Sequence, residues 1–261
     1  MPTSVSIITA VRNGAATIRD CLECVQAQTH RAEHIVVDGA SNDGTLGIVN
    51  GYRPGIAKVL SEPDRGIYDA MNKGIGLATG DVVGLLNADD FYTDERVIAK
   101  VAAAFDTMPI EALFADLVYV RPDNLNKVVR HYSGANFSLA MFAIGWMPPH
   151  PTCFIRRECY LKYGLFKTDY RIAADFELLA RFLVKHRVRY RYLPEVLVKM
   201  RTGGISTRNL MNNVLMNREV LRACRENDIG TNMLRIYSKY PGKVRQLCVW
   251  PQVAWRHGGC S

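Results

Sequence analysis

The sequence lacks any apolar run of about 18 residues or longer, so we expect no helix that spans a membrane. Its N-terminus, residues 1–6, also lacks the basic segment followed by an apolar one that is typical of a signal peptide. Seven cysteines are scattered along 261 residues. An odd number of cysteines without a signal peptide indicates reduced thiols and therefore a cytoplasmic protein.

Two glycine-rich phosphate-binding loops are also missing. No G-x-G-x-x-G follows the first expected strand, and no G-x-x-x-x-G-K-[ST] occurs in the chain. These absences argue against a dinucleotide dehydrogenase and a P-loop NTPase. The single C-x-x-C, formed by Cys21 and Cys24, has no second pair at zinc spacing. Residues three apart share one face of a helix, so this pair favours helix core over a metal site.

Charge is distributed unevenly along the chain. Residues 1–150 hold 12 Lys and Arg against 17 Asp and Glu, whereas residues 151–261 hold 21 against 8. A basic second half is typical of a surface that meets nucleic acid, anionic lipid headgroups or diphosphates. A solvated surface with a basic bias is the plain alternative.

Short apolar runs alternate with helical segments, first regularly and then less so. The expected strands are 5–11, 34–38, 58–61, 81–86, 113–120, 127–132, 152–156 and 189–200. The expected helices are 15–28, 45–52, 67–78, 96–105, 175–185, 210–226 and 232–250. This order predicts an α/β fold with a mostly parallel central sheet and helices on both faces. We expect one domain over 1–207, with halves 1–111 and 112–207, and a helical basic extension over 208–261.

Polar residues follow three of the early strands at 9–14 (TAVRNG), 38–45 (DGASNDGT) and 87–90 (NADD). The carboxyl ends of parallel strands share one edge of a sheet, where ligands bind. Asp89 and Asp90 directly follow an apolar strand, and carboxylates together with substrate phosphates are ligands that Mg²⁺ and Mn²⁺ prefer. A helix cap is the alternative, because both residues and Asp94 precede the helix expected at 96.

These runs together resemble the signature of family 2 glycosyltransferases. Residues 62–74 (EPDRGIYDAMNKG) strengthen the resemblance and are similar to the branch that builds bacterial surface polysaccharides such as colanic acid, capsule and O-antigen. The likeness is dense over residues 5–92 and patchier to about 206. It implies a Rossmann-like GT-A fold and transfer of a sugar from a nucleotide diphosphate donor, in most cases a UDP-sugar, to an acceptor hydroxyl.

The resemblance also implies roles for residues of the first half. Those assigned to the donor are Thr9, Arg12, Asp38, Arg65, Asn87 and Asp89, with Thr9 and Asp38 at the nucleobase and Arg65 near the base or diphosphate. Asp89 and Asp90 match the D-x-D element that holds the metal. Asn87 stands where that element often begins with Asp, so it keeps an acceptor oxygen but loses the charge. This departure shifts metal binding toward Asp89.

The second half resembles the family at three further places. Residues 174–181 (ADFELLAR) are similar to the pattern E-D-x-E-L-x-x-R, which matches Asp175 to the catalytic Asp and puts Ala174 where an acid often stands. An inverting transfer needs such a carboxylate to take the acceptor proton, and an N-cap role is compatible with it. His150 resembles an acceptor-side histidine, with a structural histidine as the alternative. Arg201, Gly203 and Gly204 resemble a segment that closes over the diphosphate, with a plain turn as the alternative.

The C-terminal stretch 232–255 interleaves apolar and aromatic residues with Lys and Arg. This pattern suits a helix in a membrane interface, broken at Pro241, although packing on the domain fits equally well. We therefore predict a metal-dependent, inverting glycosyltransferase that uses Mg²⁺ or Mn²⁺ and does not bind nucleic acid. The resemblance implies a polyprenyl-diphosphate-linked saccharide or another saccharide as acceptor and peripheral contact with the inner face of the cytoplasmic membrane. A sugar nucleotidyltransferase and a non-enzymatic nucleic-acid-binding protein are the alternatives.

Overall fold

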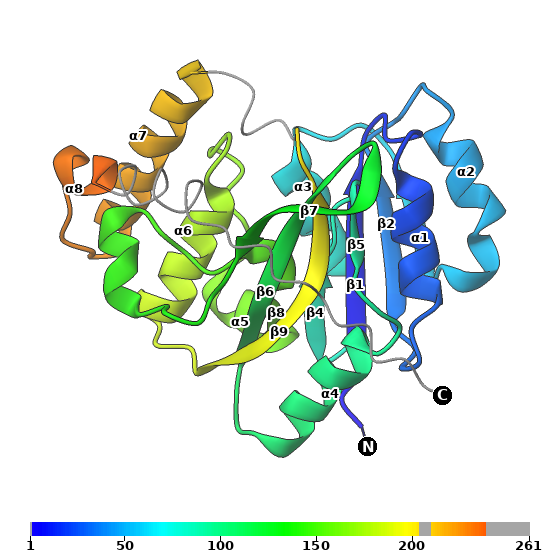
Figure 1. The fold of residues 1–261 in the computed structure, drawn as a ribbon, viewed down its shortest axis with the longest axis horizontal. Coiled ribbons are helices and arrows are strands. Elements are labelled where there is room, and N and C mark those ends of the chain that lie inside the picture. Colours follow the sequence, from blue (N-terminus) through cyan, green and yellow to red (C-terminus); the bar gives the residue numbers. More distant parts are fainter. Residues whose placement is uncertain (1, 204–209, 239–261) are drawn as a thin grey trace.

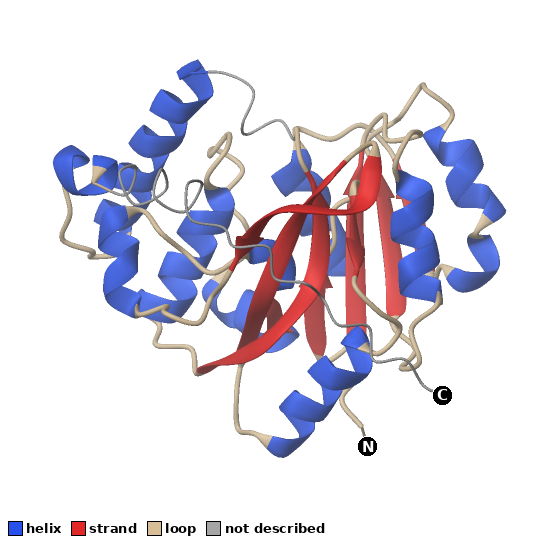
Figure 2. Cartoon of the chain, in the orientation of Figure 1, coloured by secondary structure: helices blue, strands red, loops and turns tan. Residues whose placement is uncertain are grey.

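The computed structural model describes residues 2–203 and 210–238, and this part of the chain contains one nine-stranded sheet flanked by helices (Figures 1 and 2). The strands are β1 Val5–Val11, β2 Glu33–Asp38, β3 Lys58–Ser61, β4 Val82–Leu85, β5 Asp90–Tyr92, β6 Ala112–Arg121, β7 Asn124–Tyr132, β8 Phe154–Arg156 and β9 Tyr190–Arg201. The α-helices are α1 Ile18–Gln26, α2 Thr45–Gly51, α3 Ile67–Leu77, α4 Val97–Thr107, α5 Arg157–Tyr163, α6 Ala174–Ala180, α7 Leu210–Glu226 and α8 Met233–Tyr237. Short 3₁₀ turns lie at Arg53–Gly55, Leu139–Ile144 and His150–Thr152.

The sheet has the order β3-β2-β1-β4-β8-β6-β9-β5, with β7 paired to β6. In the first half, β1 pairs in parallel with β2 and β4, and β2 pairs in parallel with β3. In the second half β6 and β9 are parallel, whereas β8, β7 and β5 join by antiparallel pairing. Residues 122 and 123 alone connect β6 to β7, and so short a connection permits only a hairpin. The expected α/β architecture is confirmed, and the parallel pairings dominate in its first half.

Helices cover both faces of the sheet because successive side chains of a strand point to opposite faces. On β1, Val5 and Ile7 pack with α1 and α4, and Ile8 and Ala10 pack with α3 and the α6 region. A Cβ added at Gly74 of α3 would lie 2.3 Å from Ile8 Cγ2, so this helix lies close against the sheet. That close approach holds the start of α3 at the carboxyl ends of the parallel strands.

Several boundaries differ from the sequence-based expectation. The helix expected from 15 begins at Ile18, and the one expected over 175–185 divides into α6 and a π-helical turn, Arg181–Lys185. β5 was not expected, because three residues between polar neighbours form a strand only through pairing with β9. The last expected helix is described only as α8, and its residues from 239 lie outside the described part, as does the boundary near Thr207. None of the helices in the described ranges has the length and apolar character that crossing a bilayer requires.

Candidate active site

The carboxyl ends of β1, β2 and β4 meet at one edge of the sheet, as the order of strands requires. The backbone N–H of Asn13 donates to Ser41 Oγ at 2.8 Å, and that of Gly14 donates to Thr45 Oγ1 at 2.9 Å. A Cβ added at Gly14 would lie 3.6 Å from the Cβ of Ala88. The loops after the three strands are therefore packed together and form a common strand-end surface.

Two of the residues assigned to the nucleobase lie deep in this region. Asp38 is fully buried and accepts hydrogen bonds from the Ser41 N–H at 3.2 Å and from Ser61 Oγ at 2.7 Å. Thr9 is also fully buried, and its hydroxyl lies 3.1 Å from His34 Nε2. Burial lowers the pKa of His34 to about 4, so this ring is neutral at pH 7. The Thr9 side chain is engaged within the core, and its expected contact with the nucleobase stays a prediction.

The two arginines of the first half that were predicted to bind the donor lie nearer the surface. A Cβ added at Gly39 would lie 2.1 Å from Asp64 Oδ2 and 3.4 Å from the Cβ of Arg12. The turn before α3 therefore folds over the end of β2 and approaches Arg12. Arg65 follows in this turn, has a side chain that is 80% exposed, and pairs with Asp69 through Nη2 and Oδ1 at 3.2 Å. Such an exposed pair is weak, so the guanidinium is available for a ligand.

The turn after β4 gives its two aspartates different surroundings. Asp90 is fully buried, its Oδ2 accepts from Asn87 Nδ2 at 2.9 Å, and its Oδ1 has no partner among the described residues. Burial, and then the neighbouring charge of Asp89, raise the pKa of Asp90 to about 8. Asp89 is half-buried, and no donor to its carboxylate is found in the described part of the chain. Asp89 is therefore the carboxylate of this pair that an external ligand reaches.

Arg201 is used to hold this turn in place. Its Nη1 donates to the backbone oxygen of Asp89 at 2.6 Å, its Nη2 pairs with Asp20, and its guanidinium lies 5.0 Å from the centre of the Phe91 ring. Gly203 has φ +102°, a conformation that favours glycine, and Gly204 lies outside the described residues. In this structure Arg201 orients the turn after β4, and its expected contact with the diphosphate stays a prediction.

The described residues contain no preformed cluster of metal-binding side chains at the strand ends. Within residues 2–203 and 210–238, no group of three or more His, Cys, Asp or Glu side chains is arranged to hold an ion. Mg²⁺ and Mn²⁺ are commonly held by one or two carboxylates together with substrate phosphates. The open Asp89 carboxylate fits a cation that is shared with a bound diphosphate.

Asp175 and His150, predicted from separate parts of the sequence, are in contact. Asp175 is the second residue of α6, and its Oδ2 lies 3.2 Å from His150 Nδ1 while its Oδ1 accepts from the Phe176 N–H at 2.8 Å. The Asp175 side chain is only 16% exposed. Burial is the main cause that raises its pKa, a charge on His150 opposes the shift, and the negative charge of Glu219 adds to it. This environment produces a carboxylate with an increased affinity for protons.

Two tyrosines on β6 and β7 respond to charges of the candidate site. The Arg130 guanidinium lies 5.3 Å from the centre of the Tyr119 ring and 5.6 Å from that of Tyr132. Burial raises the pKa of both tyrosines, with a further contribution from Asp90 at Tyr119 and from Asp175 at Tyr132. Asp90 and Tyr119 are linked by strand pairing, because both pair with Met200 of β9.

The family model for glycosyl transferase family 2 matches residues 6–163 of the chain. The protein belongs to this family. An uncharacterized glycosyltransferase of Mycobacterium tuberculosis is 35% identical over 182 residues, which cover 68% of each chain. A PGL/p-HBAD biosynthesis glycosyltransferase of Mycobacterium bovis is 29% identical over 260 residues, which cover 96% of each chain. The family assignment therefore favours a glycosyltransferase over the two alternatives that the sequence left open, a sugar nucleotidyltransferase and a nucleic-acid-binding protein.

Solved structures confirm the GT-A type of fold for this family 2 member. S. aureus TarS 1–349 in complex with UDP-GlcNAc superposes with a TM-score of 0.66 at 18% identity, over 87% of this chain and 68% of that one. The mannosyltransferase PcManGT from Pyrobaculum calidifontis, in complex with GDP-Man and Mn²⁺, gives a TM-score of 0.63 at 21% identity, over 85% of this chain and 65% of that one.

Sequence reasoning missed two residues that contact the loop before Asp175. Tyr68 on α3 donates its hydroxyl hydrogen to the Ile172 carbonyl at 2.5 Å, and Glu219 on α7 accepts from the N–H groups of the same loop. Tyr68 lies within the recognised 62–74 stretch, so its position was a signal that could have been used. Glu219 lies on a helix with no distinguishing pattern, and only the tertiary structure brings it to the site.

Proposed function

We propose that this protein transfers a sugar from a nucleotide diphosphate donor, with a UDP-sugar as the expected class, to an acceptor hydroxyl with inversion at the anomeric carbon. The observation that carries the proposal is Asp175, a nearly buried carboxylate at the start of α6 that contacts His150. Two solved structures of the same fold hold nucleotide sugars, UDP-GlcNAc in one and GDP-Man in the other, which supports a donor of this class.

In the proposed reaction, Asp175 takes the proton of the acceptor hydroxyl while the hydroxyl oxygen attacks the anomeric carbon. The bond from that carbon to the diphosphate oxygen breaks, and its electron pair leaves with the nucleotide. A raised pKa makes Asp175 a stronger base, and a charge on His150 opposes that shift. Attack from the face opposite the leaving group accounts for inversion.

Asp89 is the residue we assign to the metal, with Asp90 and Asn87 shaping the turn that presents it. A bound Mg²⁺ or Mn²⁺ would neutralise negative charge that develops on the departing diphosphate. Arg201 helps to hold the Asp89 turn in place, because its guanidinium donates to the Asp89 backbone oxygen. Arg12 and Arg65 at the strand-end surface are the proposed partners of the donor phosphates or base.

A thermal-shift screen of nucleotide sugars with and without Mn²⁺ tests the donor class. A ligand at 100 times its Kd stabilises the folded state by about 2.7 kcal/mol. Each kcal/mol is expected to raise Tm by roughly 2–4 °C in a domain of about 150–250 residues. We expect at least one UDP-sugar to raise Tm, and to raise it more with Mn²⁺. If no nucleotide sugar moves Tm in either condition, the proposed donor class is wrong.

We propose a saccharide on a polyprenyl diphosphate as the acceptor, with peripheral binding of the protein to the inner face of the cytoplasmic membrane. The support is the composition of residues 239–261, which combine two tryptophans with four Lys and Arg. Aromatic and basic residues together favour an anionic membrane interface. A surface-polysaccharide pathway is part of the same proposal, since it would supply such an acceptor.

Removal of residues 239–261 is expected to reduce the fraction of protein that floats with anionic vesicles. The cut belongs after Ser238, because Ile236 of α8 is fully buried and the Asn232 side chain caps that helix by accepting from the Arg235 N–H at 2.9 Å. An unchanged Tm would show that the shortened protein keeps its fold. Equal flotation of both forms would mean that the tail has no part in membrane binding.

A further inference from the structure

The loop before Asp175 is held by a single buried carboxylate from the C-terminal part of the chain. Glu219 on α7 accepts three successive backbone N–H groups, from Arg171 at 2.8 Å, from Ile172 at 2.9 Å and from Ala173 at 2.9 Å. Glu219 is 8% exposed. A buried charge is tolerated when hydrogen bonds replace its hydration, and here one side chain satisfies the polar groups of a whole turn.

The same loop is held from its other side by α3. The Tyr68 hydroxyl donates to the Ile172 carbonyl at 2.5 Å, and the Tyr68 ring stacks on Phe166 with centroids 5.6 Å apart. Ile172 is therefore fixed through its N–H by α7 and through its carbonyl by α3. Residues 171–173 lead directly into α6, so their position determines where Asp175 stands.

We propose that Glu219 is a positioning residue for the transfer reaction, which fixes the 171–173 loop and thereby orients Asp175 toward the acceptor hydroxyl. The inference rests on the proposed function, because it assumes that Asp175 is the base. It also assigns a role in the active site to α7, a helix that lies beyond the residues 6–163 matched by the family model.

The charge of Glu219 provides a way to distinguish this role from a purely structural one. His150 and Glu219 of α7 are the charged side chains that act on the pKa of Asp175. The titratable groups on which the Asp175 charge acts in turn are Tyr68 of α3, Tyr132 of β7 and Cys153 after the 3₁₀ turn. Burial is the largest cause of the raised Asp175 pKa, His150 lowers that pKa, and Glu219 raises it. Removing either charge should therefore move the titration of Asp175, and in opposite directions.

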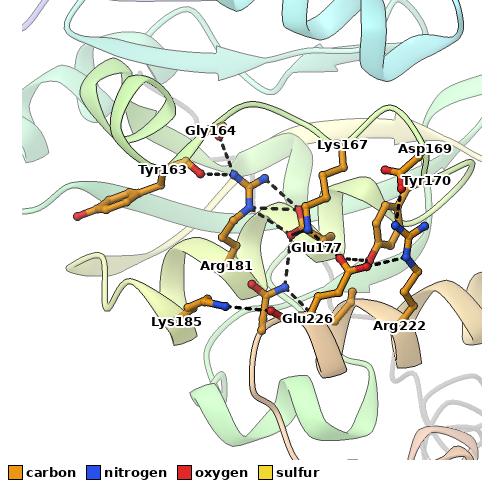
Figure 3. A network of polar contacts seen from close by, with 12 residues as sticks. Tyr163, Gly164, Lys167, Asp169, Tyr170, Glu177, Arg181, Lys185, Arg222 and Glu226 are labelled. Carbon is orange, nitrogen blue, oxygen red and sulfur yellow. Dashed lines mark hydrogen bonds and ion pairs between the residues drawn. The ribbon is translucent and has the colours of Figure 1, made fainter.

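A second set of contacts attaches α7 to the domain independently of Glu219 (Figure 3). Glu226 accepts from Lys167 Nζ at 2.7 Å and from the Tyr170 hydroxyl at 2.9 Å, and it pairs with Arg222 at 2.7 Å. Lys167 also contacts the buried Glu177 at 3.0 Å. This network anchors the end of α7 to α6 and the loop before it, so a variant at position 219 retains an attachment that supports folding.

The test is Glu219→Gln, which removes the charge and replaces one acceptor oxygen by a donor that opposes the backbone N–H groups. We expect kcat to fall by about 10- to 100-fold with the donor KM nearly unchanged, because the base is displaced while the donor site is intact. The acidic limb of the pH profile of kcat should move to lower pH, since the Asp175 carboxylate loses a repulsive neighbour. His150→Gln should move the same limb to higher pH.

Glu226→Gln is the matched control, because it changes a carboxylate of the same helix that is not among the causes of the Asp175 shift. We expect it to lower Tm and leave the acidic limb at its wild-type pH. A Glu219→Gln limb that stays in place or moves to higher pH overturns the inference. If Glu219→Gln does not fold, Glu219→Asp keeps the charge but is shorter, and wild-type kcat in that variant overturns the inference instead.

Failure of the inference and failure of the proposed function give different results. If Asp175→Asn keeps wild-type turnover, Asp175 is not the base and the proposed function fails. If Asp175→Asn is inactive while Glu219→Gln has the wild-type kcat and pH profile, the base assignment stands and only the role of Glu219 is wrong.

Discussion

Replacement of Asp175 by Asn is expected to reduce turnover by roughly 10²–10⁴ while donor binding stays close to that of the wild type. The amide cannot take the acceptor proton, whereas its oxygen can still accept from the Phe176 N–H that Asp175 Oδ1 binds at 2.8 Å. Steady-state kinetics gives the turnover, and a donor-induced thermal shift gives the binding. A variant that keeps more than about a tenth of wild-type turnover would contradict the assignment of the base.

The same variant is expected to unfold at an equal or higher temperature at pH 7. Burial raises the pKa of Asp175, so the folded state holds a proton there more tightly than the unfolded chain does. The ionised carboxylate therefore destabilises the folded protein once the pH rises above the ordinary Asp range, and Asn removes that cost. Asp169→Asn serves as a control on the same loop, because Asp169 is 60% exposed and pairs with Arg222. We expect it to leave turnover unchanged.

Replacement of Asp89 by Ala is expected to abolish the part of donor binding that depends on Mn²⁺. The Asp89 carboxylate has no donor among the described residues, so its loss removes the metal contact without breaking a hydrogen bond that holds the fold. The Arg201 contact is made to the Asp89 backbone oxygen and survives the change. Titration of UDP with and without Mn²⁺ measures the change in affinity. Steady-state kinetics should show that turnover falls to near the background rate.

Asp94→Asn is the control for this experiment. Asp94 lies in the same stretch but pairs with Lys100 at 3.1 Å and has a side chain that is 39% exposed. We expect that variant to keep the Mn²⁺-dependent affinity for UDP. If Asp89→Ala shows the same affinity for UDP with and without Mn²⁺ as the wild type, the metal is held elsewhere or is not used.

Much of the fold follows from local sequence patterns. The apolar runs at 5–11 and 58–61 and the helix at 210–226 were predicted with the bounds that the structure shows, because their periodicity is uninterrupted. β5 and the π-helical turn were missed. Both depend on neighbours far along the chain, and a three-residue strand has no periodicity of its own.

The candidate site was likewise predicted only in part from the sequence. The family resemblance predicted Asp89, Asp175 and His150 singly, but it did not predict that the last two are in contact. It also assigned Asp90 to the metal. In the structure that side chain is buried beside Asn87, and its metal contact stays a prediction. Asp90 is the first residue of β5, and which side of a strand faces a ligand depends on the strand pairing. Glu219 lies outside every motif and became visible only through its hydrogen bonds.

The attachment of α7 to the loop before α6 determines where a chimera between two members of this family should be joined. A chimera joined near residue 207 would combine the base of one protein with the terminal helix of another, and the three N–H groups of residues 171–173 would lose their matched carboxylate. A junction placed before the loop that begins at Gly164 would carry Asp175, Glu219 and the Glu226 network as one unit. The contact between Asp175 and His150, which lies before that junction, would be the pair to match between the two proteins.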